Sequence, residues 1–450
     1  MPSRLSPDDS LGGHADASPG AERADISAPA ERADSDACPG ALRLHDAADG
    51  PLARVRIPGG RITGVQLAEL RAIAAEWGDG HLELTSRANL QLRALRDVDP
   101  VRLAGRLSAV GLLPSSTHEL VRNIAGSPLL ADPTPIAALD EALCADPALA
   151  ALPGRFLFAI DDGTGDVARS ADVAALPDGA LLFAGRDLGL RVDREQLVPA
   201  LIAAGHAFLA LAAEDVESGR RRPWRVRELA DGPARMAAVV GTHLGDPAVP
   251  LRTAPTDRVG QTPADATTHP HADLTLGALV REPIGVIAQA DGRVTVGALV
   301  PLGMLGEEAI RVLEAAATLV VTPWRGVVVP DVPADQAEGW LRKLARAGLE
   351  TAAGSRWVGV TSCAGRPGCA KALADVRADA DATTRPGAGL PVHWVGCGRG
   401  CGSPAGPHVR VEATDAGYAV SVAPQDDERT VAGPVPATEV ATLVAAVRKG

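Results

Sequence analysis

The stretch "HLELTSRANLQLR", residues 81-93, alternates strictly between apolar and polar positions. Side chains on a strand point alternately to its two faces, so one unbroken strand here would be two-sided. Its apolar face would carry four leucines, Leu82, Leu84, Leu90 and Leu92. Its polar face would carry Arg87, Asn89, Gln91 and Arg93. The polar face is either solvated or an anion-binding surface, because guanidinium groups pair bidentately with carboxylates.

Helical periodicity occurs in two places that resemble each other. The apolar positions are Leu70, Ile73, Ala74 and Trp77 in the first helix, and Ile310, Leu313 and Ala317 in the second. The surrounding segments, 55-87 and 298-325, both read strand, Pro-x-Gly, helix, strand, then Thr and Arg. The correspondences pair Pro58 with Pro301, Gly60 with Gly303 and Arg87 with Arg325. The sequence therefore predicts a duplicated α+β unit in a protein of two pseudo-twofold halves.

The duplication divides the chain into predicted segments. Residues 1-36 hold too few large apolar groups to offset the entropy of ordering, so we expect a disordered tail. The polar, proline-containing stretch 255-280 is the predicted linker between the halves. The first half then has a strand-helix-strand unit at 37-115 and an α/β module at 116-254, and the second half repeats them at 281-350 and 351-450.

Composition excludes some classes of protein. Hydrophobic residues make up 46% and charged residues 22%, as in ordinary globular proteins. No uninterrupted apolar run reaches the roughly 18 residues of a membrane span. A net charge of −12 and an aromatic content of 2% argue against nucleic acid as the main partner. The N-terminus has no apolar stretch typical of a signal peptide, so we expect a cytoplasmic protein.

Four of the six cysteines lie in the last quarter of the chain, at Cys363, Cys369, Cys397 and Cys401. Their spacing is C-x5-C, then 27 residues, then C-x3-C. A cytosolic chain of 450 residues does not need disulfides for stability. Zinc pairs usually have about two to four intervening residues, whereas an iron-sulfur cluster spreads four thiolates over a wider cube. The spacing favours a cluster and leaves zinc and disulfides as alternatives.

Glycine surrounds the last two cysteines, at positions 396, 398, 400 and 402. Glycine adopts positive φ and allows close approach, so these positions would let backbone amides reach the sulfur of a cluster. After Cys369, "AKALADVRADA" (370-380) predicts a helix. The N-terminus of this helix either points towards an anionic cluster or merely packs.

Six stretches resemble the siroheme-dependent nitrite and sulfite reductases and the related precorrin-3B synthases, in family order over roughly residues 40-420. They are "LTSRANLQLR" (84-93), "VRNIAGSPLL" (121-130), "LPGRFLFAIDDG" (152-163), "TPWRG" (322-326), "TSCAGRPGCAKAL" (361-373) and "VGCGRGCGSPAG" (395-406). The resemblance implies an α+β, duplicated nitrite/sulfite reductase-like fold, with two ferredoxin-like half-domains and two α/β cluster-type modules in a pseudo-twofold arrangement. It also implies that Cys363, Cys369, Cys397 and Cys401 ligate a [4Fe-4S] cluster.

The same resemblance implies a tetrapyrrole pocket lined by basic and amide side chains. The matching positions are Arg87, Asn89, Arg122, Asn123 and Arg155, with Arg325 a weaker match. The reductases usually carry Lys-x-Lys after "LP", but here Arg155 fills the first basic position and Leu157 removes the second. Each charge-assisted hydrogen bond to an oxyanion contributes about 1.5–3 kcal/mol, so this loss disfavours sulfite reduction.

Segments 38-60 and 156-163 resemble the precorrin-3B synthases in particular. That resemblance implies O₂-dependent hydroxylation of precorrin-3A with lactone formation, in aerobic cobalamin biosynthesis. It implies an NADH-linked or ferredoxin-like electron donor, and the arginine-rich stretch 219-228 is either a docking surface for it or simply solvated. A mononuclear non-haem iron is also implied. Its ligands are not legible, and His45, Asp46 and Asp49 are weak candidates.

Two alternatives stay open. A siroheme-dependent nitrite or sulfite reductase would hold siroheme as a cofactor and show strong Soret and red absorption. A non-catalytic cluster protein would act as an electron carrier or redox sensor, but it would not need the duplicated scaffold or the pocket arginines.

Overall fold

The computed structural model describes residues 38–245, 282–404, 406–423 and 429–448. The predicted tail, 1-36, and the predicted linker, 255-280, lie outside the described residues. All the described residues belong to one compact unit, Asp36–Gly450. The boundaries drawn from the sequence inside this unit stay a prediction.

Two antiparallel sheets form the half-domains and exchange a strand. The first has the order β1 (Ala53–Val55), β4 (Leu90–Leu92), β3 (Leu82–Leu84) and β12 (Met304–Leu305). The second has the order β10 (Gly285–Ala288), β11 (Val294–Leu299), β14 (Gly326–Val332), β13 (Thr318–Val321) and β2 (Arg61–Thr63). Each half of the chain thus gives its equivalent strand to the sheet of the other half, as β12 pairs with β3 and β2 with β13. This arrangement confirms the predicted duplication.

Helices cover these sheets. They are α1 (Gly64–Trp77), α2 (Pro100–Ala109), α6 (Glu307–Leu313) and α7 (Ala337–Arg346). Helix α1 contacts α6, and an ion pair of 2.6 Å between Arg71 and Glu314 strengthens this junction. The predicted apolar positions of both helices are buried in one shared core, except Ala317. That residue is exposed because α6 ends at Leu313 and the chain turns before β13.

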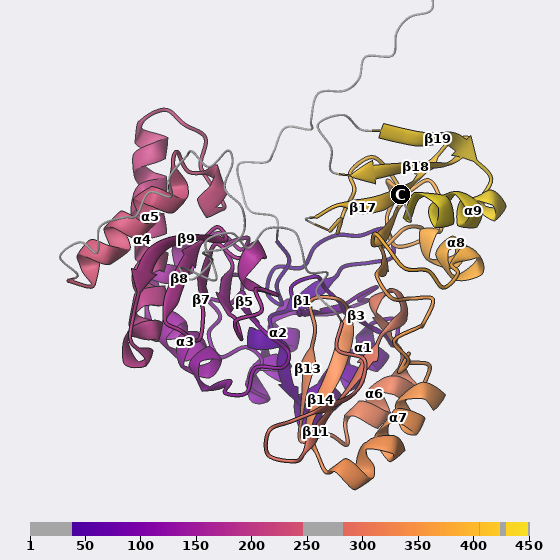
Figure 1. Cartoon of the computed structure of the whole chain (residues 1–450), viewed down its shortest axis with the longest axis horizontal. Helices are drawn as coiled ribbons and strands as arrows, with labels where there is room; N and C mark the ends of the chain where they lie inside the picture. Colours follow the sequence, from indigo (N-terminus) through magenta and orange to yellow (C-terminus); the bar gives the residue numbers. More distant parts are fainter. Residues whose placement is uncertain (1–37, 246–281, 405, 424–428, 449–450) are drawn as a thin grey trace, which may run out of the picture. The chain divides into compact units, whose positions relative to one another are not determined.

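The two α/β modules share one topology (Figure 1). The first sheet contains β5 (Ile124–Gly126), β6 (Phe158–Ile160), β7 (Val173–Ala175), β8 (Ala180–Phe183) and β9 (Arg186–Arg191), with helices α3 (Thr134–Ala145), α4 (Leu197–Glu217) and α5 (Gly232–His243). The second contains β15 (Val360–Ser362), β16 (Val392–Val395), β17 (His408–Thr414), β18 (Gly417–Ala423) and β19 (Arg429–Val435), with α8 (Val376–Thr383) and α9 (Ala437–Arg448). In both sheets the first two strand pairings are parallel and the last two pairings are antiparallel.

Short 3-10 helices connect the elements. They lie at Pro58–Gly60 (η1), Pro147–Ala151 (η2), Ala168–Ser170 (η3), Arg194–Gln196 (η4), Val226–Glu228 (η5), Pro301–Gly303 (η6) and Ala334–Gln336 (η7). The first and the sixth carry the two Pro-x-Gly sequences of the repeat, so these parts of the predicted correspondence are confirmed.

Helix α4 has the length and apolar composition that a membrane span would need. The candidate span, Arg194–Glu217, is half buried inside the protein. Ala204 and Phe208 of α4 are fully buried in the core of the first module, and α4 contacts β7 and α5 (Figure 1). This packing is typical of a core helix.

The alternating stretch 81-93 is not one unbroken strand, so the condition for a single two-sided strand is not met. Strand β3 ends at Leu84, β4 begins at Leu90, and the chain reverses between them. The backbone N–H of Ala88 donates to the Thr85 carbonyl at 3.1 Å, and Ala88 has a φ of 56°, in the left-handed region. The four leucines are still buried together, because the hairpin pairs them across the two strands. Arg87 therefore lies in a turn and not on a strand face.

The turn also corrects the internal alignment. In the second half, Arg325 donates its N–H to the Thr322 carbonyl at 3.1 Å and has a φ of 63°. These are the bond and the conformation that Ala88 has in the first half. Arg325 is thus equivalent to Ala88, and the predicted pairing of Arg87 with Arg325 was wrong by one residue.

The helix predicted directly after Cys369 begins later. Helix α8 starts at Val376, where the Asp375 side chain accepts a hydrogen bond from the Ala378 N–H at 3.1 Å as an N-cap. Aspartate at position 375 competes for backbone amides and favours a cap over a helix interior. The intervening residues 370–375 form turns, so this helix does not start at the cysteine.

A buried carboxylate lies between the second half-domain and the second module. Glu282 accepts one long hydrogen bond, from the Gly359 N–H at 3.4 Å, and among the described residues its Oε2 has no partner. Burial raises the pKa of Glu282 from 4.5 to about 7.

We expect this group to make stability depend on pH. The folded protein binds the proton more tightly than the unfolded chain, so the stability is complete below pH 4.5 and is lost as the pH rises towards about 7. Glu282→Gln should therefore raise the thermal unfolding midpoint at pH 8 and change it little at pH 4.5. The exposed Glu308→Gln is the control, and equal effects of both changes would contradict this account.

Candidate functional site

The four clustered cysteines lie in loops that follow the first two strands of the second module. Cys363 comes directly after β15, and its N–H donates to the Trp394 carbonyl of β16 at 2.9 Å. Cys397 and Cys401 lie in the loop after β16, and Cys369 lies in the loop that follows Cys363. Because the carboxyl ends of parallel strands meet at one edge of a sheet, the fold gathers these loops. All four thiols are free of disulfides.

The spread of the sulfur atoms distinguishes the metal alternatives. Burial raises the pKa of the Cys401 thiol, and the neighbouring thiols of Cys363, Cys397 and Cys369 raise it further, so the four lie near one another. Within the described chain, however, no three of these sulfurs all lie within 4.8 Å of one another. Tetrahedral zinc, with Zn–S bonds of about 2.3 Å, would hold them about 3.8 Å apart. The wider arrangement fits a [4Fe-4S] cube better.

The glycine-rich loop is shaped for close approach. The Gly396 N–H donates to Cys363 Sγ at 3.2 Å, so a backbone amide of this loop reaches one of the four thiols. A Cβ at Gly396 would lie 2.6 Å from that of Ala372, so no larger residue fits. Gly400 and Gly402 have φ values of 58° and 82°, which favour glycine. The donor set and its surroundings therefore fit a cluster.

Cationic and imidazole side chains hold the carbonyls of these loops. Nε2 of His393 lies 3.0 Å from the Cys401 carbonyl, and Nη2 of Arg410 donates to the Gly398 carbonyl at 3.0 Å. Burial lowers the pKa of His393 to about 3, which keeps this imidazole neutral. The loop geometry is therefore fixed by side chains that are not themselves ligands.

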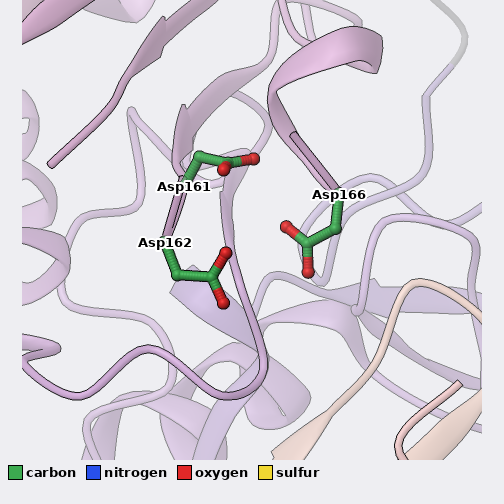
Figure 2. A group of neighbouring side chains, drawn as sticks. All are labelled: Asp161, Asp162 and Asp166. Atoms are coloured by element: carbon green, nitrogen blue, oxygen red, sulfur yellow. The ribbon is translucent and has the colours of Figure 1, made fainter. Parts of the chain in front are cut away.

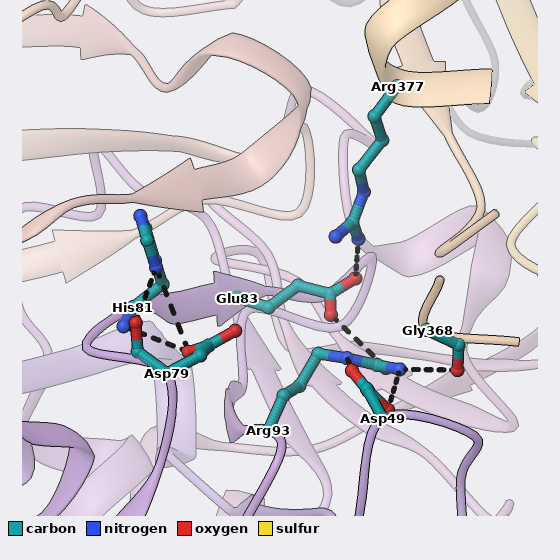
Figure 3. Close-up of polar contacts among 7 residues, drawn as sticks. All are labelled: Asp49, Asp79, His81, Glu83, Arg93, Gly368 and Arg377. Carbon is teal, nitrogen blue, oxygen red and sulfur yellow. Dashed lines mark hydrogen bonds and ion pairs between the residues drawn. The ribbon is translucent and has the colours of Figure 1, made fainter. Parts of the chain in front are cut away.

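Arg93 joins the first half-domain to the cysteine loops (Figure 3). Its guanidinium binds both carboxylate oxygens of Asp49 at 3.1 Å and donates to the Gly368 carbonyl, next to Cys369, at 3.0 Å. Glu83 lies 3.5 Å from Arg93 and 2.6 Å from Arg377 of α8. The network is internally neutral, with two cations and two anions.

Three of the five predicted tetrapyrrole-binding residues meet at one short loop. Arg87 donates to the Arg155 carbonyl at 3.0 Å and to the Gly154 carbonyl at 3.4 Å, and Asn123 donates to the Gly154 carbonyl at 2.9 Å. The exposed Arg155 side chain stacks on Trp224, with its Cζ 4.9 Å from the ring centroid. Burial, and then Arg225, lower the pKa of Arg87 to about 10. Arg87 is thus a desolvated cation, as an anion site requires.

Arg122 does not join this group. Its guanidinium binds both oxygens of Asp140 on α3, at 2.8 and 2.7 Å, and donates to the Leu112 carbonyl at 2.9 Å. Asn89 is also buried, and its Oδ1 accepts the Ile57 N–H at 2.8 Å. Asn123 makes a second hydrogen bond, to the Leu120 carbonyl at 2.9 Å. These contacts favour structural roles for Arg122, Asn89 and Asn123.

Arg56 is a further buried cation that was not among the predicted site residues. This arginine on the chain leaving β1 is 3% exposed, its Nη1 donates to the Pro39 carbonyl at 3.2 Å, and among the described residues its Nε has no partner. Burial, and then Arg54, lower its pKa to about 9, and Arg87 contributes to the same repulsion. A cation between Val55 and Ile57, two buried apolar residues, was the signal that could have revealed it.

The arginine-rich stretch 219-228 does not act as one surface. Arg225 is buried and pairs with Asp172 at 2.6 Å, whereas Arg220, Arg222 and Arg227 are exposed. Only the exposed arginines remain candidates for docking an electron donor.

The weak iron candidates near the N-terminus do not assemble. His45 and Asp46 are exposed and Asp49 is paired with Arg93, and in the described ranges no three metal-ligating groups converge there. Three carboxylates do converge in the first module, at Asp161, Asp162 and Asp166 (Figure 2).

These three carboxylates follow β6 in the first module. Because the two modules share one topology, this position is equivalent to that of the cysteine loops in the second module. Ser127 follows β5 as Cys363 follows β15, and Ser127 donates to Asp166 at 2.5 Å. The two oxygens of Asp161 accept four backbone N–H groups of its own loop. These hydrogen bonds therefore stabilise the loop after β6.

Comparison with known proteins identifies relatives over most of the chain. Residues 45–108 match the family described as the nitrite/sulfite reductase ferredoxin-like half domain. A ferredoxin–nitrite reductase of Synechococcus elongatus is 28% identical over 404 residues, which cover 78% of this chain and 74% of that protein. A precorrin-3B synthase of a Sinorhizobium species is 26% identical over 404 residues, covering 86% and 82%.

A solved structure has a similar fold. The NirA protein of Mycobacterium tuberculosis superposes with a TM-score of 0.66 at 19% identity, covering 89% of this chain and 80% of that one. The expected duplicated fold is thus confirmed. The relatives by sequence are oxidoreductase-type enzymes, which supports an enzyme of that broad type.

Proposed function

We propose that this chain, a member of the nitrite/sulfite reductase superfamily by its fold and its ferredoxin-like half domain, is a precorrin-3B synthase. In this proposal it hydroxylates precorrin-3A with O₂ and forms a lactone, in the cytoplasm, as a step of aerobic cobalamin biosynthesis. The similarity to a precorrin-3B synthase over 86% of the chain supports the proposal, but similarity to a nitrite reductase is of the same order. The distinction must come from the site.

The environment of Leu157 is the observation that carries the proposal. This residue stands where the reductases usually have the second basic residue, and it is 3% exposed. It packs in an apolar group with Ala125, Ala159 and Val167. A lysine at this position would lose its hydration without gaining an ion-pair partner. The apolar packing around residue 157 therefore excludes a cation there, in agreement with the leucine in the sequence. A small oxyanion would therefore lack part of its binding site.

A tetrapyrrole substrate suits the remaining arginines. Precorrins carry many carboxylates, and Arg56, after β1, and Arg87, in the turn between β3 and β4, are desolvated cations near enough to repel each other. They attract a bound carboxylate more strongly than an exposed arginine does, because water screens their charge less. We propose Arg87 and Arg56 as the principal carboxylate contacts, with Arg155 at the margin.

The reaction requires electrons as well as O₂. One oxygen atom enters the substrate, and the other leaves as water after taking up two electrons and two protons. We propose that Cys363, Cys369, Cys397 and Cys401 hold a [4Fe-4S] cluster, which supplies electrons one at a time when bound. The donor is proposed to be NADH-linked or ferredoxin-like. A mononuclear iron also belongs to this proposal, without assigned ligands.

Two measurements on one preparation test the proposal against siroheme-dependent reduction. Protein reconstituted without oxygen is mixed with precorrin-3A and a chemical reductant that supplies the two electrons, and is then exposed to O₂, and the product is analysed by mass spectrometry. We expect a hydroxylated lactone, and an absorption spectrum with the broad band of a cluster only. A strong Soret band together with reduction of nitrite or sulfite would support the reductase instead.

We expect Arg87→Ala to weaken precorrin-3A binding by about ten- to a hundredfold, the loss of one charge-assisted contact. Binding can be followed by titration under anaerobic conditions, with iron content measured on the same sample. The exposed Arg43→Ala is the control, since its charge is solvated. Unchanged affinity in Arg87→Ala, with normal iron content, would remove this residue from the substrate site.

A further inference from the structure

Arg325 occupies a turn where an arginine is costly. It connects β13 to β14 with a φ of 63°, in the left-handed region that disfavours residues with a Cβ by about 1–2 kcal/mol. The equivalent turn of the first half has a small residue, Ala88, in the same conformation. The backbone therefore tolerates this conformation in both halves, and the long cationic side chain is what distinguishes the second turn.

The guanidinium of Arg325 lies beside the cysteine loops. A Cβ placed on Gly402, the residue after Cys401, would be 3.2 Å from its Nη2. Its aliphatic part packs against Gly303, where a Cβ would be 2.7 Å from Cδ of Arg325. Cys363 is also near enough to act on the arginine electrostatically. The side chain thus extends from the second half-domain towards the loops that carry Cys363 and Cys401.

Arg325 differs from its cationic neighbours in having no anion paired to it. Arg93 and Arg377 share the carboxylates of Asp49 and Glu83 (Figure 3), and Arg410 pairs with Glu412 at 2.6 Å. Within the described part of the chain, Arg325 makes no ion pair and no side-chain hydrogen bond. Desolvation lowers its pKa, and the nearest carboxylate that acts on it, Glu83, is already shared by Arg93 and Arg377 and offsets this only in part. A desolvated cation without a partner is unfavourable unless something negative is bound nearby.

We propose that Arg325 is the cationic partner of the cluster. This inference rests on the proposed [4Fe-4S] cluster, whose four thiolate ligands give it a net negative charge. The guanidinium beside Gly402 would offset that charge, and the offset would be larger once an electron is added. Arg325 is therefore a positioning residue that favours the reduced cluster, and with it the transfer of electrons to the tetrapyrrole pocket.

The reduction potential tests this role. We expect Arg325→Gln to move the cluster potential to a more negative value, and Arg325→Lys to restore most of it. The matched control is Arg399→Gln. Arg399 lies between two of the cysteines in sequence, but it is exposed, so water screens its charge. The control should move the potential much less. Equal shifts in Arg325→Gln and Arg399→Gln would overturn the proposal.

Unfolding with and without the cluster separates electrostatic from structural roles. In protein stripped of iron, Arg325→Gln should leave the midpoint of thermal unfolding unchanged or raise it. The change removes an unpaired, desolvated charge, and it leaves the strained backbone conformation at residue 325 as it was. In protein with the cluster, the same change should speed loss of iron to a chelator. A lower midpoint in the stripped protein would show that Arg325 holds the fold, and would contradict this inference.

The wild-type protein decides whether the premise holds. If analysis finds no bound iron and sulfide after anaerobic reconstitution, the proposed cluster fails and the proposal for Arg325 fails with it. If the cluster is present and Arg325→Gln changes only precorrin-3A affinity, Arg325 is a substrate residue and the inference alone is overturned. A shifted potential with unchanged affinity supports it.

Discussion

Serine at any one of positions 363, 369, 397 or 401 should remove most of the bound iron or leave a cluster that no longer persists in air. Each of these thiols lies in a loop at the same edge of the second module, and none is engaged in a disulfide. A serine hydroxyl is a much poorer ligand than a thiolate, so one iron of the proposed cube would lose its thiolate and be released more easily. Iron and sulfide content, with EPR after reduction, measures the effect.

Cys144→Ser is the matched control for this series. Cys144 lies on α3 in the first module, and burial raises the pKa of its thiol, so it is suited to packing and not to ligation. We expect this variant to keep its full iron content. Normal iron content and activity in any one of the other four variants would refute the assignment of that cysteine.

Arg122→Ala should destabilise the protein by about 3–5 kcal/mol, because it leaves the carboxylate of Asp140 without its partner. The Arg122 side chain is 4% exposed and that of Asp140 is 18% exposed, so water cannot replace the lost ion pair fully. The hydrogen bond to the Leu112 carbonyl is lost as well. Denaturant unfolding monitored by tryptophan fluorescence gives the change in stability.

Two companion variants make this result specific. The exposed Arg155→Ala should cost far less, since it removes only a stacking contact with Trp224. The double change Arg122→Met with Asp140→Leu should recover much of the stability, because no charge is then left unpaired. An Arg122→Ala protein of normal stability with weakened precorrin-3A binding would show that Arg122 contacts substrate after all.

The sequence predicts the duplication well because both copies keep the proline and glycine residues that the backbone conformation requires. Pro58 and Pro301 begin equivalent 3-10 helices, and the glycines that follow them adopt positive φ in both halves. The strand exchange between the halves cannot be predicted from the sequence of either repeat. Strands β2 and β12 could form the same number of backbone hydrogen bonds by pairing within their own half. Only the three-dimensional arrangement of the two sheets decides which partner each strand takes.

The hairpin at 81-93 shows why side-chain pattern alone misleads. An alternating pattern is the same for one long strand and for two short strands joined by an odd number of residues, because both keep the leucines on one face. The reversal depends on Thr85, whose hydroxyl accepts the N–H groups of Arg87 and Asn89 at 3.3 and 3.1 Å. Such a turn has no strong glycine or proline signal here.

The candidate site was only partly predictable for a different reason. Spacing along the chain singled out four cysteines, and the fold brings their loops to one edge of the second module. The role of an arginine depends instead on what faces it. Arg122 matches a family position, yet Asp140 occupies its guanidinium, whereas Arg56 matches nothing in the pattern and lies desolvated beside Arg54. Charge pairing across the fold cannot be inferred from spacing.

The most direct test of the proposed function follows the oxygen atoms in a single turnover. Anaerobically reconstituted protein, reduced and loaded with precorrin-3A, is exposed to ¹⁸O₂, and the product is compared by mass spectrometry with that formed under ¹⁶O₂. The precorrin-3B synthase proposal predicts a product that carries one ¹⁸O atom, formed only when O₂ is present. Unlabelled precorrin-3A recovered unchanged, from protein that contains a complete cluster and reduces nitrite with bound siroheme, would contradict it.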